Sequence, residues 1–279
     1  MSTLNSIEVK IVADKDRKKS FLHGLIGRGW FMAIASPVLL LLIWEVLVRV
    51  GLLDPRFFPS PSSIIEEFFA MSTTPDLWID IGYTISRMMI GFFLGAIPGV
   101  FFGVVMGISK TLRNVLQPII SAIYPIPKIA LFPLVMLIFG LGDPSKWVIV
   151  AIAVFFQVFM STLAGVVNID RIYLDVAKNF HATRWQTYRT IALPASVPYI
   201  FTGFQLGMGM ALIVVIIAEN FGTNHGLGYV IWHSWQIFEV RDMFVALILV
   251  SLIGYLLQLG IVKLEQMLIP WKRPARTTR

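Results

Sequence analysis

The sequence predicts an all-α membrane protein that crosses the bilayer six times and keeps both termini in the cytoplasm. Of its 279 residues, 57% are hydrophobic and only 14% are charged, and the mean hydropathy is +0.77. A soluble domain usually carries about 25% charged residues, so this chain lacks the polar surface that water requires. Its apolar residues form long charge-free runs, and about 20 such residues suffice for a membrane-spanning helix.

Five of these runs predict complete spans. A helix satisfies its own backbone hydrogen bonds in hydrocarbon, which makes it the expected form for a long apolar run. We expect the first, second, fourth, fifth and sixth spans within residues 30–48, 88–109, 147–169, 190–218 and 243–262.

The third span is expected to be interrupted. Two apolar pieces, residues 114–127 and 129–142, are separated by Lys128, and prolines fall across both. Each proline removes a backbone donor and favours a kink, which lipid tolerates only beside protein or a water-filled cavity. We favour one broken span that faces the interior of the bundle; the alternative is an interfacial loop followed by a short helix.

Basic residues set the expected orientation. Lys and Arg are enriched in short cytoplasmic segments, and here they gather in both tails and between the spans at 109–114 and 170–194. We therefore expect a cytoplasmic N-terminal tail at 1–29, a membrane domain at 30–264 and a basic cytoplasmic C-terminal tail at 265–279. The charged start has no cleavable apolar core and is not expected to be a signal peptide.

Several functional classes are disfavoured by composition. The chain has no cysteine, which excludes disulfides and thiolate metal sites. Its +7 net charge lies in short stretches between apolar runs, which argues against nucleic-acid binding. His225 and His233 have no carboxylate at ligand spacing, so no metal site is expected, and the neighbouring Trp232 and Trp235 fit an interfacial aromatic belt.

The second span carries a ridge of glycines. A small residue every four positions lets two helix backbones approach closely, which is a main source of helix association in lipid. The pattern does not tell whether the neighbouring helix belongs to this chain or to a second copy. The glycines are Gly91, Gly95, Gly99, Gly103 and Gly107.

Ionisable residues in or near the spans are candidates for function, because a charge at the bilayer centre is costly. They are Glu45, Arg87, Lys128 and Glu219. A structural role is favoured for each: the two glutamates lie near outer ends, Arg87 can snorkel to the surface, and Lys128 can occupy the break in the third span.

The longest internal cytoplasmic segment, residues 173–194, predicts two short amphipathic helices with a corner near His181 and Ala182. Apolar side chains recur on one face of each helix at steps of three. Pro194 is expected to mark the start of the next span, since proline favours the first helical turn. From the pattern alone, this apolar stripe is as readily a docking surface as a self-packing one.

This segment resembles the loop signature of ATP-binding-cassette (ABC) importer permeases, which reads Glu-Ala-Ala, three residues, Gly, nine residues, Ile, any residue, Leu-Pro. Here Asp175-Val176-Ala177, His181, Ile191, Leu193 and Pro194 stand at that spacing. In the family the loop is a coupling helix that fits a groove on the ATPase subunit. Asp replaces the Glu, and His replaces the corner Gly, whose backbone conformation histidine adopts more readily than most residues.

The resemblance implies an ATPase-coupling role for a set of residues in this segment. They are Asp175, Ala177, Phe180, His181, Ala182, Arg184, Trp185, Tyr188, Arg189, Ile191, Leu193 and Pro194.

The likeness extends over roughly residues 30–270, toward the permeases for nitrate, sulfonate, taurine and bicarbonate. It is carried by Trp44-Glu45, Pro59-Ser60-Pro61-Ser62, Ser86-Arg87, Pro125-Ile126-Pro127, Gly140-Leu141-Gly142, Ala218-Glu219 and Gly226-Leu227-Gly228-Tyr229. It implies a type I importer permease in a bacterial inner membrane, working as a homodimer with two ATPase subunits and an extracytoplasmic binding protein.

A small anion is expected to cross by ATP-driven alternating access, along a path lined by the third and fifth spans. Its candidate residues are Arg87, Lys128, Val135, Phe139, Gln205, Met208 and Glu219. The slim glycine-rich face around Met208 suits a gate or, equally, simple helix packing. The main alternative is a proton- or ion-coupled secondary transporter with no ATPase partner, which would usually show buried acidic relays and internal repeats.

The chain itself is not expected to be an enzyme or to bind a cofactor. It lacks the glycine-rich phosphate loop, and no lysine follows a glycine. ATP and Mg²⁺ are therefore expected in the partner ATPase. The sequence also shows no combination of nucleophile, base and acid that would indicate a catalytic site.

Overall fold

The computed structural model describes residues 35–269, except for the side chains of Arg171, Leu174 and Arg184. All regular elements in this part of the chain are helices, which confirms the all-α prediction. The expected N-terminal tail and most of the C-terminal tail lie outside the described residues. Contacts divide the chain into two units, Met1–Glu66 and Glu67–Arg279.

In the first unit, Glu45 joins a helix at residues 35–49 to the segment that follows it. Its carboxylate accepts hydrogen bonds from the backbone N–H of Ser62 (3.0 Å) and the Ser62 hydroxyl (2.7 Å). It also pairs with Arg49 one turn away, at 2.6 Å. The helix holds the described part of the expected first span, and Glu45 has a structural role within this unit.

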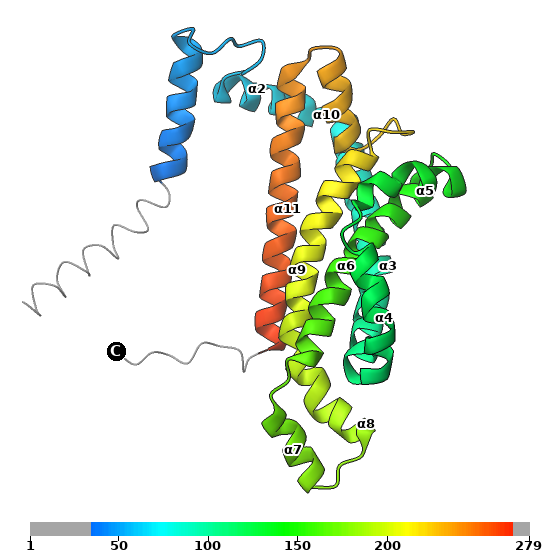
Figure 1. Cartoon of the computed structure of the whole chain (residues 1–279). Helices are drawn as coiled ribbons and strands as arrows, with labels where there is room; N and C mark the ends of the chain where they lie inside the picture. Colours follow the sequence, from blue (N-terminus) through cyan, green and yellow to red (C-terminus); the bar gives the residue numbers. More distant parts are fainter. Residues whose placement is uncertain (1–34, 270–279) are drawn as a thin grey trace, which may run out of the picture. The chain divides into compact units, whose positions relative to one another are not determined.

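Four long helices in the second unit are apolar enough to cross a membrane: Pro75–Ile108, Asp143–Val167, Trp185–Ala218 and Val240–Leu268. The first, second and fourth are α3, α6 and α11, and the third includes α9 (Leu193–Ala218). They run side by side in Figure 1. They contain the expected second, fourth, fifth and sixth spans. The total of six spans and the cytoplasmic termini stay predictions.

All four of these helices begin earlier than the charge-free runs predict, and the second and fifth spans differ most from the prediction. The second span was expected from residue 88, but α3 begins at Pro75 and includes Asp76, Asp80 and Arg87. The helix that includes α9 starts at Trp185, within the expected coupling loop. The predicted runs ended at charged residues. In the folded chain, Asp80 and Arg87 find partners on other segments, and the helix continues through them.

The predicted break in the third span is confirmed. A first helix, α4 (Lys110–Ile123), is followed by η1 (Lys128–Leu131) and α5 (Phe132–Phe139). The two arms meet at 83°. Lys128 occupies the break, where its ammonium donates to the carbonyls of Tyr124 and Ile126. These are carbonyl groups that the interrupted helix leaves without regular partners.

The remaining helices lie at the two ends of the bundle. Helices α7 (Arg171–Asn179) and α8 (Arg184–Thr187), followed by one π-helical turn at Tyr188–Ala192, extend beyond one end of α6 and α9. Helix α10 (Leu227–Gln236) lies at the other end (Figure 1). Helix α2 (Pro61–Ser72) includes the division between the two units, which falls after Glu66.

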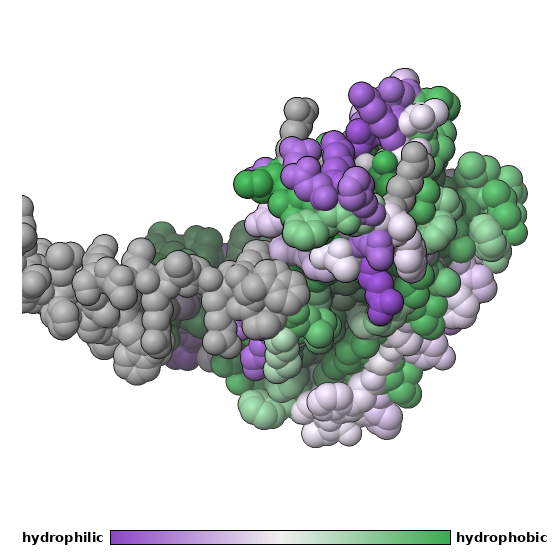
Figure 2. Space-filling view, turned by 90° about the horizontal axis from the view of Figure 1, so that it is seen from below, coloured by the Kyte–Doolittle hydropathy of each residue, from purple (hydrophilic) through white to green (hydrophobic). Residues whose placement is uncertain are grey.

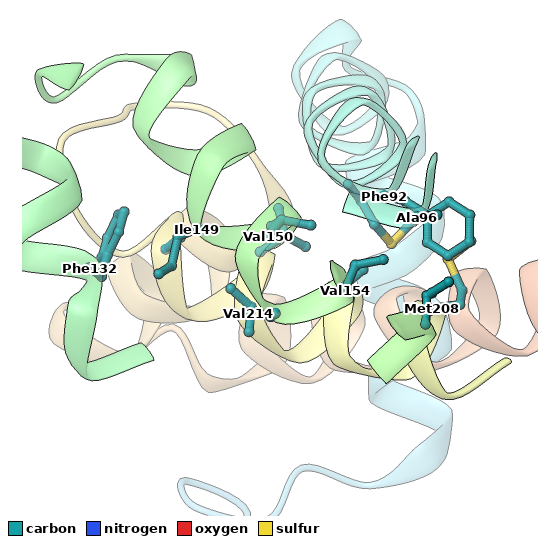
Figure 3. Packing of buried hydrophobic residues seen from close by; sticks show 14 of the residues in the cluster. Phe92, Ala96, Phe132, Ile149, Val150, Val154, Met208 and Val214 are labelled. Carbon is teal, nitrogen blue, oxygen red and sulfur yellow. The ribbon is translucent and has the colours of Figure 1, made fainter. Parts of the chain in front are cut away.

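The apolar core lies where α3, α5, α6 and α9 meet. Figure 3 shows Phe92 and Ala96 of α3, and Met208 and Val214 of α9, on either side of residues from α6. The labelled α6 residues are Ile149, Val150 and Val154, and Phe132 comes from α5. Helix α6 is therefore the central helix of this unit.

The glycine ridge of α3 packs against α6 of the same chain. A Cβ atom added to Gly91 would lie 2.6 Å from Val150, one on Gly99 would lie 3.0 Å from Val158, and one on Gly107 would lie 2.5 Å from Val166. Real Cβ atoms essentially never come within 3.0 Å of another heavy atom, so the contact requires glycine at positions 91 and 107 and leaves little room at position 99. The question left open by the sequence is settled: the neighbour is α6.

We predict that Gly95→Ala destabilises the protein because an added Cβ would lie 3.0 Å from the backbone Cα and carbonyl carbon of Ala151, which cannot move aside alone. Overpacking of this kind costs about 1–3 kcal/mol. The measurement is the thermal unfolding midpoint of the purified protein in detergent. The matched control is Gly82→Ala on the same helix, which has open space around it. Equal midpoints for the two variants would contradict the packing.

Candidate functional site

At the end of the bundle near α10, Arg87 is the centre of a buried group of charges. Its Nε donates to Asp143 Oδ1 (2.7 Å), and its Nη1 donates to Glu219 Oε1 (2.9 Å) and to the carbonyl of His225 (2.6 Å). Its Nη2 donates to the hydroxyl of Thr223 at 3.0 Å. Every nitrogen of the guanidinium therefore has a protein partner, and the side chain is only 3% exposed.

Glu219, at the end of α9, is the main acceptor and is fully buried. Besides Arg87, it accepts from the Thr84 hydroxyl (2.8 Å) and from the backbone N–H of Gly228 (2.9 Å). A Cβ on Gly226 would lie 2.5 Å from both carboxylate oxygens, and Gly226 has a φ of 118°. The Gly226-Leu227-Gly228 turn thus wraps around this carboxylate, and only glycine fits at position 226.

Two further charges belong to the same region. Asp80 accepts from the backbone N–H of Gly226 at 2.8 Å and lies 3.4 Å from His225 Nδ1. Lys146, also fully buried, donates to the carbonyls of Leu141 (3.0 Å) and Gly142 (3.4 Å). We call Asp80, Arg87, Asp143, Lys146 and Glu219 the buried charge cluster; four of these residues are buried, and the Asp143 side chain is 37% exposed.

The buried charge cluster fastens three separate segments together: the first third of α3, the start of α6, and the turn from α9 to α10. Burying charges is costly, and an apolar set of the same volume would often be as stable. What charges add is specificity, because their partners are fixed in number and direction. The arrangement therefore fixes the relative positions of these three helix ends.

Sequence reasoning missed Asp80, Asp143 and Lys146 as members of this cluster. All three lie outside the charge-free runs that predict the spans: Asp80 precedes residue 88, and the other two precede residue 147. A signal was present: Asp80, Thr84 and Arg87 recur at four and three residues, which places them on one face of a helix.

The other candidate path residues do not join Arg87 and Glu219. Val135 and Met208 belong to the apolar core, whereas Phe139 is 47% exposed at the end of α5. Gln205 donates to the Glu265 carboxylate of α11 at 2.8 Å. Lys128, in the break between α4 and α5, has its ammonium 4.6 Å from the centre of the Phe156 ring. The translocation path stays a prediction.

At the other end of the bundle, residues 173–194 form the two helices and the corner that the sequence predicts. Helix α7 ends at a Schellman motif: the N–H of Ala182 donates to the carbonyl of Ala177 (2.9 Å), and the N–H of His181 donates to that of Lys178 (2.9 Å). His181 has a φ of 52°, the left-handed conformation that glycine usually supplies. Histidine at the corner is thus compatible with the turn.

The second helix of the segment starts at a capping box. The Gln186 side chain accepts from the N–H of Thr183 (2.8 Å), and the Thr183 hydroxyl accepts from the N–H of Gln186 (3.2 Å). The π-helical turn Tyr188–Ala192 then connects α8 to α9, with Pro194 in the first turn of α9. The corner and the following helix are therefore held by local hydrogen bonds.

The expected coupling residues divide by exposure. Phe180 is 81% exposed and Trp185 is 66% exposed, although both are large and apolar. Asp175, His181 and Arg189 are exposed as well, and the side chain of Arg184 lies outside the described part. Ala177 is buried, and Ala182, Tyr188, Ile191, Leu193 and Pro194 are half-buried. Figure 2, seen from the end where α7 and α8 lie, shows hydrophilic and hydrophobic side chains exposed together.

We predict that Glu219→Ala lowers the stability by about 3–5 kcal/mol, because it removes one partner of a buried ion pair and leaves Arg87 with excess charge. The measurement is the thermal unfolding midpoint in detergent. Glu239→Ala, an exposed glutamate before α11, is the matched control. Adding Arg87→Met to Glu219→Ala should recover part of the loss; additive losses would show that the two side chains are not coupled.

Comparison with known proteins finds relatives that are named as permeases. The chain is 29% identical to the taurine transport system permease protein TauC of Escherichia coli (strain K12), over 88% of this chain and 91% of that protein. It is 29% identical to the putative aliphatic sulfonates transport permease protein SsuC of Bacillus subtilis (strain 168), over 94% of each. The nitrate import permease protein NrtB of Synechocystis sp. (strain ATCC 27184 / PCC 6803 / Kazusa) is 26% identical, over 91% of this chain and 94% of that protein.

Solved structures show the same fold. The inward facing MetNI methionine ABC transporter matches with a TM-score of 0.61 at 18% identity, covering 69% of this chain and 97% of that chain. An amino acid ABC transporter crystallised with histidines matches with a TM-score of 0.54 at 20% identity, covering 72% and 96%. The family model for the binding-protein-dependent transport system inner membrane component matches residues 99–268, more than half of the chain. The chain therefore belongs to this family, the membrane permeases of ABC transporters.

Proposed function

We propose that this chain is the membrane subunit of an ABC importer for a small anion of the nitrate, bicarbonate, taurine or sulfonate class. The observation that carries the proposal is the exposed aromatic surface of residues 173–194, on a segment built as a rigid corner. The names of the relatives support the choice of substrate class, since three of them are permeases for taurine, aliphatic sulfonates and nitrate.

Residues 173–194, which we call the coupling segment, continue into the membrane region through one helix. Trp185 begins a helix of 34 residues that runs to Ala218, a length of about 50 Å. Its far end is Glu219, the fully buried acceptor of the buried charge cluster. A displacement of the coupling segment is therefore transmitted along one helix to the opposite end of the bundle.

The assembly that we propose contains two copies of this chain, two ATPase subunits that bind ATP and Mg²⁺, and an extracytoplasmic substrate-binding protein. Six spans place both termini in the cytoplasm of a bacterial cell. Closure of the ATPases moves the coupling segments, and the spans alternate between outward-open and inward-open states. Arg87 and Glu219 hold helix ends in this scheme, and the remaining path residues line or support the route.

We predict that Trp185→Ala and Phe180→Ala reduce co-purification of the ATPase subunit at least tenfold. Both side chains are exposed aromatics on the proposed docking surface, and buried aromatic anchors dominate the energy of most interfaces. The measurement is a quantitative pull-down from native membranes. Trp235→Ala is the matched control, because Trp235 is 56% exposed at the other end of the bundle.

Charge reversal by Arg189→Glu should also weaken the ATPase interaction, since it places a carboxylate on the same exposed surface. Unchanged recovery of the ATPase with all three variants would contradict the coupling role of residues 173–194.

We predict that uptake of the substrate anion into proteoliposomes requires all three components and internal ATP. The measurement is accumulation of labelled taurine, an alkanesulfonate, nitrate or bicarbonate, each with the binding protein that co-purifies with this chain. Uptake that persists without ATP but stops when a proton gradient is collapsed would overturn the proposal in favour of a secondary transporter. Accumulation of one anion alone would identify the substrate.

A further inference from the structure

Two hollows lie beside the coupling segment, where α3 ends. The first has a volume of about 630 Å³ and is apolar along one side, formed by α3. Its α3 residues are Ile97, Val100, Phe101, Val104, Val105 and Ile108. Trp185 and Tyr188, whose rings lie 5.4 Å apart, close it at the coupling end.

The second hollow has a volume of about 780 Å³ and a different chemistry. It lies between the α3–α4 junction, the end of α6 and the coupling segment, and its lining includes Lys110 and Lys178. Ser109, Thr111 and Thr187 supply hydroxyl groups. Among the described residues, none that lines this hollow is acidic. Lys178 has a carboxylate 3.4 Å away, on Asp175, but both side chains are largely exposed, so this pair contributes little.

The two hollows adjoin each other, since Ile108 and Tyr188 line both of them. Along α3, the apolar hollow runs from Ile97 to Ile108, a length of about 16 Å, roughly half the thickness of the hydrocarbon core. At the helix end it borders the hollow that carries the lysines. A ligand that fits both parts has an apolar chain and an anionic head.

We propose that this joined hollow binds an anionic phospholipid of the cytoplasmic leaflet, with an acyl chain along α3 and the phosphate near Lys110 and Lys178. The basic residues lie at the end of the span where cytoplasmic segments concentrate Lys and Arg. Anionic lipids are attracted to such residues there. Trp185 and Tyr188 stand at the boundary between the two parts, the depth at which these side chains are enriched in membrane proteins.

The bound lipid contacts α3 and the coupling segment at once, because Trp185 and Tyr188 belong to the latter. The lipid therefore holds the coupling segment against the helix bundle. Any effect of the lipid on ATPase coupling rests on the function proposed above. Lipid binding itself requires only this chain, so it is measured separately from ATPase recovery.

The test is native mass spectrometry of the purified full-length chain with equal amounts of phosphatidylglycerol and phosphatidylethanolamine. We expect the wild type to retain phosphatidylglycerol preferentially. The double variant Lys110→Gln/Lys178→Gln should bind it about 30-fold more weakly, from about 1 kcal/mol for each lysine. The matched control Lys263→Gln changes an exposed lysine that does not line the hollow and should bind as the wild type does. Equal retention by the double variant and the wild type would overturn the proposal.

The apolar part is tested by Val105→Trp, which fills the hollow, against Leu94→Trp, an exposed position on the same helix outside it. Only Val105→Trp should reduce phosphatidylglycerol retention, at unchanged unfolding midpoint. Loss of dimerisation with unchanged lipid retention would instead make the hollow an interface between copies and would refute the lipid site. Binding of glycerol 3-phosphate as tight as that of the lipid would also refute it, since the acyl chain would then contribute nothing.

If Val105→Trp fails to fold, the lysine variant alone decides the outcome. Phe180→Ala separates the two proposals, because Phe180 lines neither hollow: loss of ATPase recovery in that variant with lipid retention intact leaves the lipid site standing. Conversely, loss of lipid retention in Lys110→Gln/Lys178→Gln with the ATPase still recovered would support the lipid site independently of the coupling role.

Discussion

Backbone contact between α3 and α6 is the constraint on which the rest of the second unit depends. Glycines along α3 bring the two helix axes so close that a single added methyl group would collide with α6. Helix α9 meets α6 in a similar way, with Gly203 next to Ser161 and Gly207 next to Val154 and Val158. In lipid, where apolar side chains gain little by leaving the solvent, such close fit is what holds helices together.

The buried charge cluster and residues 173–194 lie at opposite ends of this helix stack. At one end, the close approach places Arg87 of α3 within reach of Asp143 at the start of α6 and of Glu219 at the end of α9. At the other, α6 and α9 are connected by the coupling segment, whose corner is closed by its own backbone hydrogen bonds. The ends are therefore linked by long helices, and Arg87 with its partners lies at one end while the hydrogen-bonded corner lies at the other.

The sequence predicted the features that arise from local rules. The break at Lys128 follows from prolines, the corner at His181 from the spacing of the coupling segment, and the close packing of α3 from its glycines. The buried charge cluster was not predicted, because its partners are up to 146 residues apart in the sequence. For the same reason Arg87 and Glu219 were assigned to the translocation path without a sign that they bind each other. A charge in an apolar run shows that a partner is needed, but only the fold identifies that partner.

The separation of Arg87 from its partners has a consequence for biosynthesis. Asp143 follows Arg87 by 56 residues and Glu219 follows it by 132. The ribosome therefore delivers α3 to the insertion machinery well before α6, and longer still before α9. Until Asp143 has emerged, the guanidinium has neither of its two carboxylate partners, and until Glu219 has emerged it lacks the fully buried one. The first third of α3 must then remain in contact with water or with the translocon, and the helix reaches its final depth only when the fifth long apolar segment of the chain has been made.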